Sequence, residues 1–339
     1  MRFLPELGLS EDKLELVELD LKDKKILYLL SKNARLALSK IAKIVNLSRD
    51  SVAYRIKNLE KRGVLHDSLA VVDVSRFGYD SYHIFLRLNS PTREAELDLI
   101  EKIRQLPYVR ALIKFNGKYD FEVAVIAKNI LEFDGILTEI IGKTGNYLQD
   151  YELLIITENF RAGTFPDSFL KNFDYKVKPT KQQRYAPDKK DFSLIKIIRD
   201  NAQLSLLDIS KMVKLSPDAV SYRLKKLVGS GVIINYSPVI SYSTLGYNIY
   251  ALLLNINSLG SEKEKILKSF LKNNDHILWA VKTVGRYNTL IYVCTKKEDH
   301  LHKTNTELRN LFPEQIKNYE SLLAFAEYKY TYAPDVLFY

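Results

Sequence analysis

Within six residues, the sequence places four hydrogen-bonding side chains directly after Ser48: Arg49, Asp50, Ser51 and Tyr54. An arginine can form two parallel hydrogen bonds with guanine, and hydroxyl and carboxylate groups can bond to other base edges. Residues in the first turn of a recognition helix meet base edges, whereas lysines toward its end meet phosphates. If these four residues lie on one face of a helix, they can therefore recognise the bases of double-stranded DNA.

The sequence around this group, residues 38–65, predicts two short helices joined by a tight turn. Apolar residues recur at helical spacing in both helices, with Val52 at the centre of the buried side of the second. Ser48 can cap the second helix through its side-chain oxygen, and Gly63 can end it in the left-handed conformation. Two such helices with basic residues on the open face predict a helix-turn-helix unit.

A rotation of ~100° per residue from Val52 separates the outward positions of the second helix from the buried ones. The candidate DNA contacts of this unit are Arg49, Asp50, Ser51, Tyr54, Arg55, Lys57, Asn58 and Lys61. Arg55 lies at the border of the buried face. A structural or phosphate-positioning role is as open for this arginine as a base contact.

The pattern recurs at residues 206–233 with a constant offset of 168 positions, so that Ile41 matches Ile209. The offset persists to Pro334, which matches Pro166, and the chain is therefore one two-part unit written twice. The second set of candidate DNA contacts is Asp218, Ser221, Tyr222, Arg223, Lys225 and Lys226.

Two substitutions distinguish the second helix-turn-helix unit from the first. Pro217 replaces Arg49, which predicts two related but non-identical half-sites on DNA. Lys214 replaces Asn46 in the turn, where asparagine tolerates a left-handed conformation better than lysine. The second turn is therefore expected to be less well formed than the first.

The net charge of +10 is concentrated on the two predicted DNA-binding units. Residues 22–62 hold twelve basic and three acidic side chains, and residues 189–226 hold nine and four. Positive charge placed in this way suits the binding of phosphates. The hydrophobic fraction of 46%, the single cysteine Cys294 and the absence of an apolar run of ~20 residues predict a cytoplasmic protein of several domains. No membrane association and no intrachain disulfide are expected.

After each of these units the sequence predicts the order β-α-β-β-α-β, which is the ferredoxin-like plan, with a central hairpin. The fold class is therefore α+β, with two winged helix-turn-helix domains, each followed by a ferredoxin-like domain. The expected limits are 1–66 for a lead-in and the first winged helix-turn-helix domain, 67–158 for the first ferredoxin-like domain, 159–187 for a linker, 188–234 for the second winged helix-turn-helix domain and 235–339 for the second ferredoxin-like domain. Residues 165–170 are expected to pack on the first sheet.

A winged helix-turn-helix followed by a βαββαβ unit resembles the Lrp/AsnC family of feast/famine transcription regulators. The residues that carry the resemblance are Leu47-Ser48 at the turn, Tyr54-Arg55, Gly63-Val64, and Gly117-Lys118-Tyr119-Asp120 at the hairpin. Members of this family usually carry one copy per chain. The resemblance implies that the second part of each copy mediates assembly and binds a small effector, often an amino acid. The effector-binding residues that it implies are Gly117, Tyr119 and Asp120 in the first copy, and Gly285, Tyr287 and Asn288 in the second.

Two interpretations of Asp120 stay open. Its carboxylate could pair with the ammonium group of an amino acid, or it could be the satisfied carboxylate of a tight hairpin. Asn288 at the matching position cannot supply negative charge, so effector binding is expected mainly in the first copy. An architectural DNA-binding protein without an effector is an alternative. The two sheets can pair within the chain as a pseudo-dimer, or between chains in a homo-oligomer.

The enzyme alternative is a siroheme decarboxylase, because some members of that class resemble the same double plan. Such an enzyme would need basic and imidazole groups in the sensor pocket, and none of the five histidines falls on the hairpin beside Gly117 or Gly285. The sequence also has no metal-ligand spacing, no glycine-rich phosphate loop and no nucleophile–base arrangement. It therefore predicts a non-enzyme that binds double-stranded DNA and carries no cofactor or metal.

Overall fold

The computed structural model describes residues 15–173, 175, 185–257 and 259–339, and its elements repeat one order twice. The first copy comprises α1 (Leu21–Lys32), α2 (Leu38–Val45), α3 (Arg49–Lys61), β1 (Leu65–Val72), β2 (Asp80–Leu88), α4 (Arg93–Arg104), β3 (Val109–Asn116), β4 (Phe121–Ala127), α5 (Ile130–Thr144) and β5 (Leu148–Ala162). The second comprises α6 (Lys189–Ile198), α7 (Leu206–Val213), α8 (Pro217–Gly229), β6 (Ile233–Ile240), β7 (Asn248–Ile256), α9 (Ser261–Asn273), β8 (Ile277–Val284), β9 (Thr289–Thr295), α10 (Glu298–Leu311) and β10 (Ile316–Tyr330). The βαββαβ order expected after each helix-turn-helix is confirmed. The start of the expected lead-in and the centre of the expected linker, residues 176–184, lie outside the described part of the chain.

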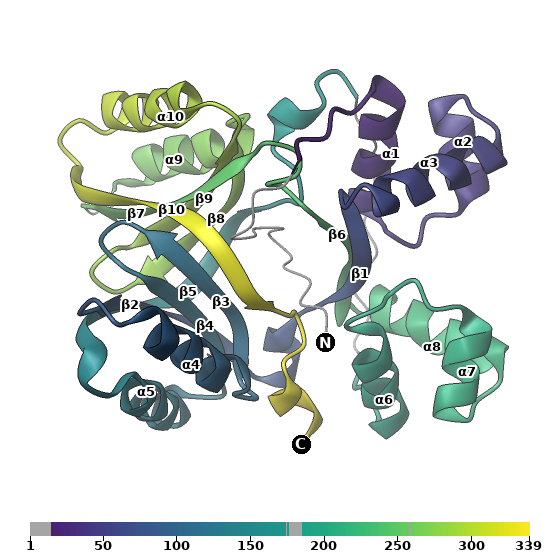
Figure 1. The fold of residues 1–339 in the computed structure, drawn as a ribbon, viewed down its shortest axis with the longest axis horizontal. Coiled ribbons are helices and arrows are strands. Elements are labelled where there is room, and N and C mark those ends of the chain that lie inside the picture. The colour runs from purple at the N-terminus through teal and green to yellow at the C-terminus, as the bar shows by residue number, and fades with distance from the viewer. Residues whose placement is uncertain (1–14, 174, 176–184, 258) are drawn as a thin grey trace.

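The two βαββαβ sheets join edge to edge into one closed barrel with the strand order β10-β3-β4-β2-β5-β8-β9-β7. Helices α4 and α5 cover the outside of the first half and α9 and α10 that of the second, while both helix-turn-helix units lie on the opposite side of the molecule (Figure 1). Side chains along β2 alternate between the helix-covered outside of the sheet and the barrel interior. Ile84 and Leu86 pack under α4 and α5, whereas Phe85 points into the barrel interior. Among the described residues, no helix is long and apolar enough to cross a bilayer.

The strand register shows that the two copies form a pseudo-dimer within the chain. Ile155 of β5 lies opposite Val284 of β8, and Leu323 of β10 lies opposite Asn116 of β3. Leu323 is the counterpart of Ile155 in the second copy, and Asn116 is the counterpart of Val284 in the first. The two pairs are therefore the same contact made in both directions. A pseudo-twofold axis therefore relates the halves, and the sheets pair within the chain.

The strand that follows each helix-turn-helix unit pairs with its counterpart in the other copy. Strands β1 and β6 form a separate antiparallel sheet, in which Leu69 lies opposite Ser237. These two residues are themselves 168 positions apart, so the pseudo-twofold axis passes between them. Each strand also accepts a hydrogen bond from the segment that follows the first helix of the other copy: Ala34 N donates to Tyr236 O at 2.8 Å, and Ala202 N donates to Ser68 O at 2.7 Å. The ladder therefore holds the two helix-turn-helix units against each other.

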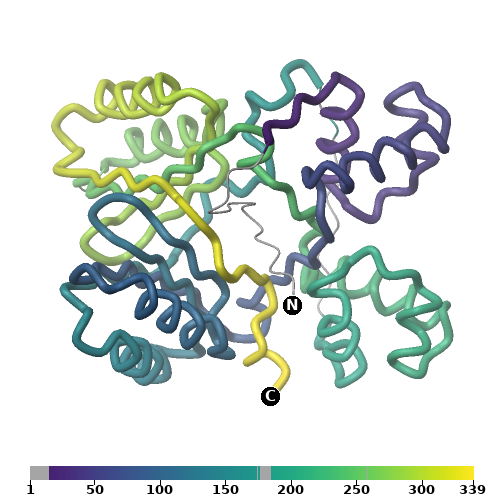
Figure 2. The backbone as a smooth tube through the Cα atoms, viewed as in Figure 1, coloured from purple at the N-terminus to yellow at the C-terminus, as the bar shows by residue number. Residues whose placement is uncertain are grey.

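The expectation that residues 165–170 pack on the first sheet is wrong, because this segment lies against the second copy. Ser168 N donates to Asp275 O at 2.9 Å, and the rings of Phe165 and Tyr242 lie 6.2 Å apart. The C-terminal tail makes the reciprocal contact, since Val336 N donates to Pro107 O at 2.9 Å. Figure 2 shows the yellow C-terminal segment running down beside the blue strands of the first copy. Exchanged tails thus add to the pairing of the halves.

Two further expectations differ from the structure. The second turn is as well formed as the first, because Lys214 adopts φ 55° and ψ 55°, close to the 53° and 62° of Asn46. The domain limits expected after residues 66, 158 and 234 fall inside β1, β5 and β6. We propose instead to end each helix-turn-helix domain after its paired strand, at Val72 and Ile240.

Candidate nucleic-acid interface and effector site

The two recognition helices are capped and oriented in the same way. Ser48 accepts a hydrogen bond from Ser51 N at 3.1 Å at the start of α3, and Ser216 accepts one from Ala219 N at 3.2 Å at the start of α8. Both caps satisfy an amide that the first helical turn leaves free. Val52 and Val220 are fully buried on the inner side, which turns the polar side of each helix outward.

The structure brings the candidate DNA contacts of each unit together on one outward face. In the first unit Arg49, Asp50, Tyr54, Lys57 and Lys61 are exposed, and Ser51, Arg55 and Asn58 are half-buried. In the second unit Asp218, Tyr222, Lys225 and Lys226 are exposed, and Ser221 and Arg223 are half-buried. Tyr54 and Tyr222 are 73% and 59% exposed, so both side chains are accessible from solvent. Such a surface can contact both bases and phosphates.

The pair Arg55 and Arg223 has a structural role in this conformation. Arg55 Nη1 lies 2.7 Å from carboxylate oxygens of both Asp20 and Asp23, at the start of α1. Arg223 Nη1 lies 2.8 Å from Asp188 and 2.9 Å from the buried Asp191. Hydrogen bonding to Arg223 lowers the pKa of Asp188. Of the two roles left open for Arg55, the geometry favours the structural one, in which the arginine ties the recognition helix to the first helix of its unit, and Arg223 makes the matching contacts.

Part of the basic charge counted from the sequence is engaged inside the protein. Lys22 Nζ donates to Val45 O at the end of α2, and Lys190 Nζ donates to Val213 O at 3.0 Å at the end of α7. Lysine in these positions satisfies carbonyl groups that a helix end leaves free. Arg35 donates to Leu204 O at 3.3 Å and so links the two units. These hydrogen bonds to neutral carbonyl groups leave the positive charges in place, but they hold the three side chains against the protein.

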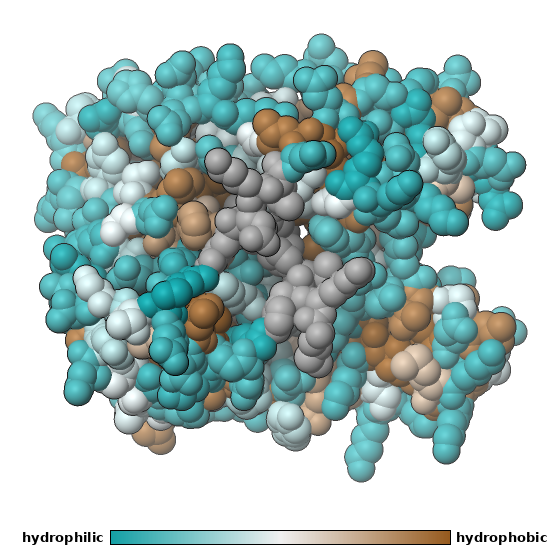
Figure 3. Space-filling view, in the orientation of Figure 1, coloured by the Kyte–Doolittle hydropathy of each residue, from teal (hydrophilic) through white to brown (hydrophobic). Residues whose placement is uncertain are grey.

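The two units differ in surface polarity. Figure 3 shows hydrophobic side chains gathering over the second unit, at the lower right, while the first unit above it is mainly hydrophilic. Leu207 and Met212 of α7 are 55% and 60% exposed. Ser39 stands at the position that matches Leu207. Helix α7 thus carries large exposed apolar side chains that α2 lacks.

The hairpins implied as the effector site lie at the seam between the copies. Gly117 has a φ of 149° and lies against Leu322, and Gly285 has a φ of 153° and lies against the main chain of Leu153. A Cβ at Gly285 would be 2.1 Å from Leu153 O, so only glycine fits there. Each hairpin therefore closes onto the last strand of the other copy.

The side chains of this seam form a polar cluster, defined here as Lys118, Tyr119, Tyr287 and Glu320 with the matching Glu152 and Arg286. Lys118 Nζ lies 3.0 Å from Glu320 Oε1, and Arg286 N donates to Glu152 Oε1 at 3.3 Å. Tyr119 and Tyr287 are almost fully buried, and burial raises the pKa of both phenols. The cluster holds charges of both signs within reach of the predicted effector residues.

The Asp120 side chain is engaged in the fold. Its Oδ2 accepts a hydrogen bond from Leu88 N at 2.7 Å, and burial raises its pKa above the ordinary value. Asn288 makes the matching contact, since its Oδ1 accepts from Ile256 N at 3.0 Å. Because an uncharged amide serves equally well in the second copy, the geometry favours the satisfied carboxylate over a ligand contact.

One buried polar cluster was not anticipated from the sequence. The Glu122 carboxylate is 1% exposed, pairs with His83 Nδ1 and accepts a hydrogen bond from the Tyr292 hydroxyl of the other copy. The signal that could have revealed it is a break in the repeat, because Ala251 and Leu290 stand where the second copy would have His83 and Glu122. Within the described residues, no group of three or more side chains could hold a metal ion.

Comparisons with known proteins agree with the helix-turn-helix geometry. The family described as winged helix-turn-helix DNA-binding matches residues 19–65 and 187–234. A solved structure of the siroheme decarboxylase NirDL, in complex with an iron-uroporphyrin III analogue, covers 91% of this chain and 92% of its own with a TM-score of 0.60. Its sequence identity of 14% makes this a likeness of fold alone.

Closer sequence relatives are regulators. An uncharacterised HTH-type transcriptional regulator of Pyrococcus abyssi is 30% identical over 143 residues, which are 42% of this chain and 94% of that protein. The HTH-type transcriptional regulator LrpA of the same organism is 31% identical over 125 residues, which are 37% of this chain and 86% of LrpA. Nearly a whole relative thus corresponds to less than half of this chain. The chain belongs to the Lrp/AsnC family of helix-turn-helix transcription regulators and carries the family's unit twice.

Proposed function

We propose that this protein is a sequence-specific regulator that binds double-stranded DNA with two helix-turn-helix readers from a single chain. The observation that carries the proposal is the pair of outward polar faces on α3 and α8, held together by the β1–β6 ladder. Family members that carry one unit per chain need a second chain to present two readers. Here one chain presents both, and two readers suit successive major-groove faces ~34 Å apart.

The two readers are expected to recognise related but different half-sites. Arg49 can bond bidentately to guanine, whereas Pro217 at the matching position has no hydrogen-bonding side chain. The exposed apolar residues of α7 weaken the second unit's contact with phosphates further. We therefore assign the larger share of sequence-specific affinity to the first unit.

The test is a fluorescence-anisotropy titration of a labelled duplex from upstream of the protein's own gene, at several salt concentrations, beside a scrambled duplex. We expect tight binding that prefers the upstream duplex and weakens steeply with salt. Arg49→Ala should cost about 1–3 kcal/mol on the preferred duplex, and Lys57→Ala should weaken both duplexes alike while lowering the salt slope by about 1. Absence of binding to either duplex at low salt would reject the proposal.

We further propose that a small effector, such as an amino acid, binds at the seam and modulates DNA binding. The seam cluster supports it, because Lys118 and Arg286 offer positive charge to a carboxylate, while Glu152 and Glu320 offer negative charge to an ammonium group. Isothermal calorimetry with amino acids tests this on the wild-type protein and on Glu320→Gln and Asp120→Ala. Loss of binding only in Glu320→Gln would place the ammonium group at the seam. Unchanged binding in Asp120→Ala would remove that residue from the site.

The decarboxylase and the architectural protein remain the competing proposals. A decarboxylase would need basic and imidazole groups in the sensor pocket. His83 lies on β2 and not on a hairpin, its Nδ1 is engaged by Glu122, and its ring stacks on Trp279 at 5.6 Å. An absorbance titration with an iron tetrapyrrole distinguishes the two functions, because a haem-type spectrum of the bound tetrapyrrole would favour the decarboxylase over the regulator. An architectural protein would bind the scrambled and upstream duplexes equally and would show no heat with amino acids.

A further inference from the structure

Two histidines of the second copy lie ring against ring at the place where the first tail, defined here as residues 163–173, crosses that copy. The imidazole of His276, directly before β8, and that of His300, in α10, have their centroids 4.3 Å apart and their planes at 18°. Ser168 Oγ of the first tail lies 3.2 Å from His276 Nδ1, and Thr295 Oγ1 lies 3.0 Å from His300 Nδ1. Neither imidazole belongs to the candidate DNA interface or to the seam cluster, so the pair needs an explanation of its own.

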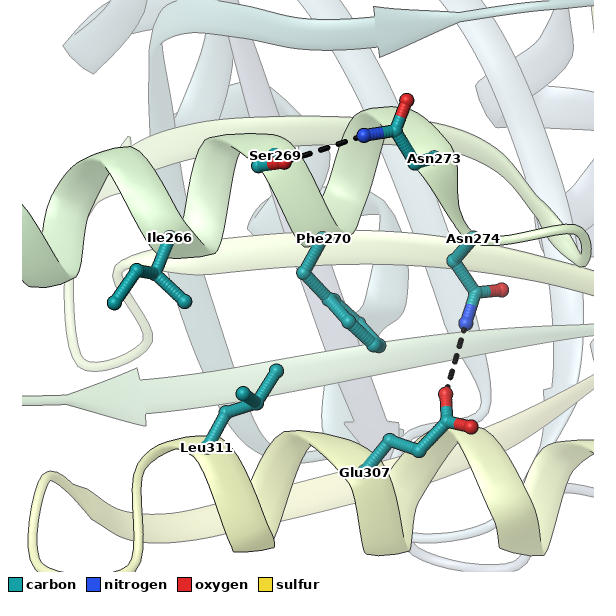
Figure 4. A pocket seen from close by; sticks show the side chains of 7 residues that line it. All are labelled: Ile266, Ser269, Phe270, Asn273, Asn274, Glu307 and Leu311. Carbon is teal, nitrogen blue, oxygen red and sulfur yellow. Dashed lines mark hydrogen bonds between the residues drawn. The ribbon is translucent and has the colours of Figure 1, made fainter.

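The loop that carries His276 is joined to α10 on one side and to the first tail on the other. His276 N donates to Asn274 Oδ1 at 2.9 Å, and the amide group of Asn274 donates to Glu307 at 3.5 Å. Figure 4 shows the Asn274 side chain pointing from the end of α9 toward Glu307 on α10. On the other side, Ser168 N donates to Asp275 O at 2.9 Å. The position of the first tail therefore depends on this loop.

The far end of the first tail contacts the first helix-turn-helix unit. The ring of Phe173 lies 5.6 Å from the ring of Tyr28 in α1, in an edge-to-face arrangement, and Lys25 Nζ lies 5.0 Å from the Phe173 ring centroid. Both geometries are favourable for an aromatic ring. In Figure 2 the teal segment of the first tail lies beside the purple α1. The first tail thus braces the first helix-turn-helix unit against the second half of the barrel.

We propose that His276 and His300 form a pH-sensitive latch, which holds the first tail while the imidazoles are neutral and releases it when they take up protons. Neutral imidazoles can stack as these two do. Two imidazolium ions with their centroids 4.3 Å apart repel each other, and movement of the loop and the tail relieves that repulsion. The latch therefore responds in the pH range in which an imidazole titrates.

The charged groups around the two histidines are already balanced. They come from the first tail, the loop, α10 and β5, and they form three ion pairs: Lys171 with Asp275 at 3.2 Å, Lys303 with Glu307 at 3.9 Å, and Arg161 with Asp167 at 3.0 Å. The end of α9 contributes carbonyl groups that Arg161 caps, and β9 contributes the uncharged hydroxyl of Thr295. Each carboxylate thus faces a cation, and none is left to neutralise a second imidazolium.

The pKa of His276 gives the direction of the response. Burial, and after it the charge of His300, lowers this pKa below the ordinary value of 6.5. Once the tail has left, the imidazole regains its ordinary pKa, so protons bind preferentially to the released state. Each pKa unit between the two states changes the latch equilibrium by up to about tenfold. The latch is therefore closed at neutral pH and weakens as the pH falls below 6.5.

The first copy provides an internal control, because its equivalent contact contains no imidazole. Tyr108 and Glu132 stand at the positions 168 residues before the two histidines. The C-terminal tail, residues 331–339, makes the matching main-chain hydrogen bond through Val336 N, at 2.9 Å. The Tyr108 hydroxyl donates to Glu139 at 2.7 Å, and burial raises its pKa. The two tails share an anchoring contact and differ in the imidazole pair.

Hydrogen–deuterium exchange of the full chain at pH 7.0, 6.2 and 5.5 tests the latch in the absence of DNA. Protection factors, which remove the intrinsic pH dependence of exchange, should fall at least about threefold for residues 163–173 between pH 7.0 and 5.5. Residues 331–339 should keep their protection, since the pKa of Lys329, about 8, lies above this range. Equal losses in the two tails, or no loss in the first, would overturn the proposal.

Two substitutions assign the response to the histidines. His276→Tyr installs the residue of the first copy and should abolish the pH dependence, while the first tail stays protected at pH 7.0. His300→Gln removes the second positive charge and should at least halve the response, and it serves if the tyrosine variant loses its circular-dichroism signal. A first tail that loosens on acidification in these variants as it does in wild type would overturn the proposal.

The consequence for DNA rests on the proposed function. Release of the first tail removes the brace from α1 and, through Arg55, from α3. The affinity for the preferred duplex should then fall between pH 7.0 and 5.5 by a larger factor in wild type than in His276→Tyr. Anisotropy titrations at both pH values measure this. Equal losses of affinity, together with a pH-dependent exchange of the first tail, would reject the link to DNA and uphold the latch.

Discussion

At the scale of single residues, alanine substitutions at the two hairpin glycines are predicted to destabilise the protein to different extents. Alanine at Gly285 would place its Cβ 2.1 Å from a main-chain oxygen, whereas alanine at Gly117 would meet the mobile end of Leu322 at 2.6 Å. A main chain cannot give way as a side chain can. We expect Gly285→Ala to lower the free energy of unfolding by about 3 kcal/mol and Gly117→Ala by about 1 kcal/mol. Urea unfolding compares them, and equal losses would contradict the close approach at Gly285.

Lys214 is a second residue whose backbone conformation makes a prediction. It holds a positive φ of 55° that asparagine occupies in the first copy. Asparagine adopts this region at lower cost, so Lys214→Asn should stabilise the second unit by about 0.5–1 kcal/mol. Asn46→Lys is the matched control and should destabilise the first unit by a similar amount. A higher urea midpoint for the first variant and a lower one for the second are the expected readouts.

Residue roles were only partly predictable from the sequence. Helical spacing was enough to place Tyr54 and Lys57 on an open face, because that depends on neighbours a few positions away. The roles of Arg55 and Asp120 stayed open, since their partners Asp20 and Leu88 lie more than thirty positions away. A one-dimensional pattern cannot show which distant group a side chain meets.

At the scale of elements, each long terminal strand of one copy caps a helix of the other. Lys329 of β10 donates to Arg104 O and Leu106 O at 2.7 and 2.9 Å, at the end of α4. Arg161 of β5 makes the matching contacts with Lys272 O and Asn274 O at 2.6 and 3.0 Å, at the end of α9. The pseudo-symmetric pair thus joins each helix to the opposite half.

Lys329 predicts a pH dependence. Burial lowers its pKa to about 8, below the ordinary value of 10.5 that an unfolded chain retains. Between these two values the folded protein releases a proton that the unfolded protein keeps. The free energy of unfolding should therefore rise with pH from about 8 toward 10.5 through this group. Urea midpoints at pH 7, 8.5 and 10 measure this rise.

Arg161, which matches Lys329 in the first copy, suggests the control for that prediction. Lys329→Arg should keep the helix-capping hydrogen bonds, as Arg161 does, but arginine stays charged throughout this range. The variant should lose the rise in stability while it remains folded at pH 7. If wild type and variant show the same slope between pH 8.5 and 10, the titrating group is not Lys329.

The order of the elements was predictable, and their partners were not. The β-α-β-β-α-β order expected after each helix-turn-helix unit is the one observed, from β2 (Asp80–Leu88) onward in the first copy, because local periodicity fixes an element. The pairing of β1 with β6 and the exchange of the tails depend on contacts across more than a hundred positions. The sequence repeat indicated two similar units. Whether these units pair within one chain or between chains could be seen only from the strand register in the structure.

At the scale of the whole molecule, the tandem arrangement replaces a concentration-dependent dimer by a tethered one. Linking two modules makes their second contact intramolecular, with an effective concentration that reaches millimolar values for short linkers. The barrel seam, the β1–β6 ladder and the exchanged tails then fix the geometry of the halves. The two readers therefore have a defined spacing at any protein concentration.

That fixed spacing gives the last prediction, which concerns a duplex with two half-sites. One chain should bind per duplex, and its affinity should not depend on a preceding dimerisation step. Insertion of five base pairs between the half-sites turns the second one to the far side of the helix, where the rigid ladder prevents α8 from reaching it. We expect an affinity loss of at least about tenfold, since even one lost base-pair contact costs about 1–3 kcal/mol. Anisotropy titrations of the native and lengthened duplexes measure it. A chain that tolerates the insertion would have independently hinged readers, and the ladder between Leu69 and Ser237 would then not set their spacing on DNA.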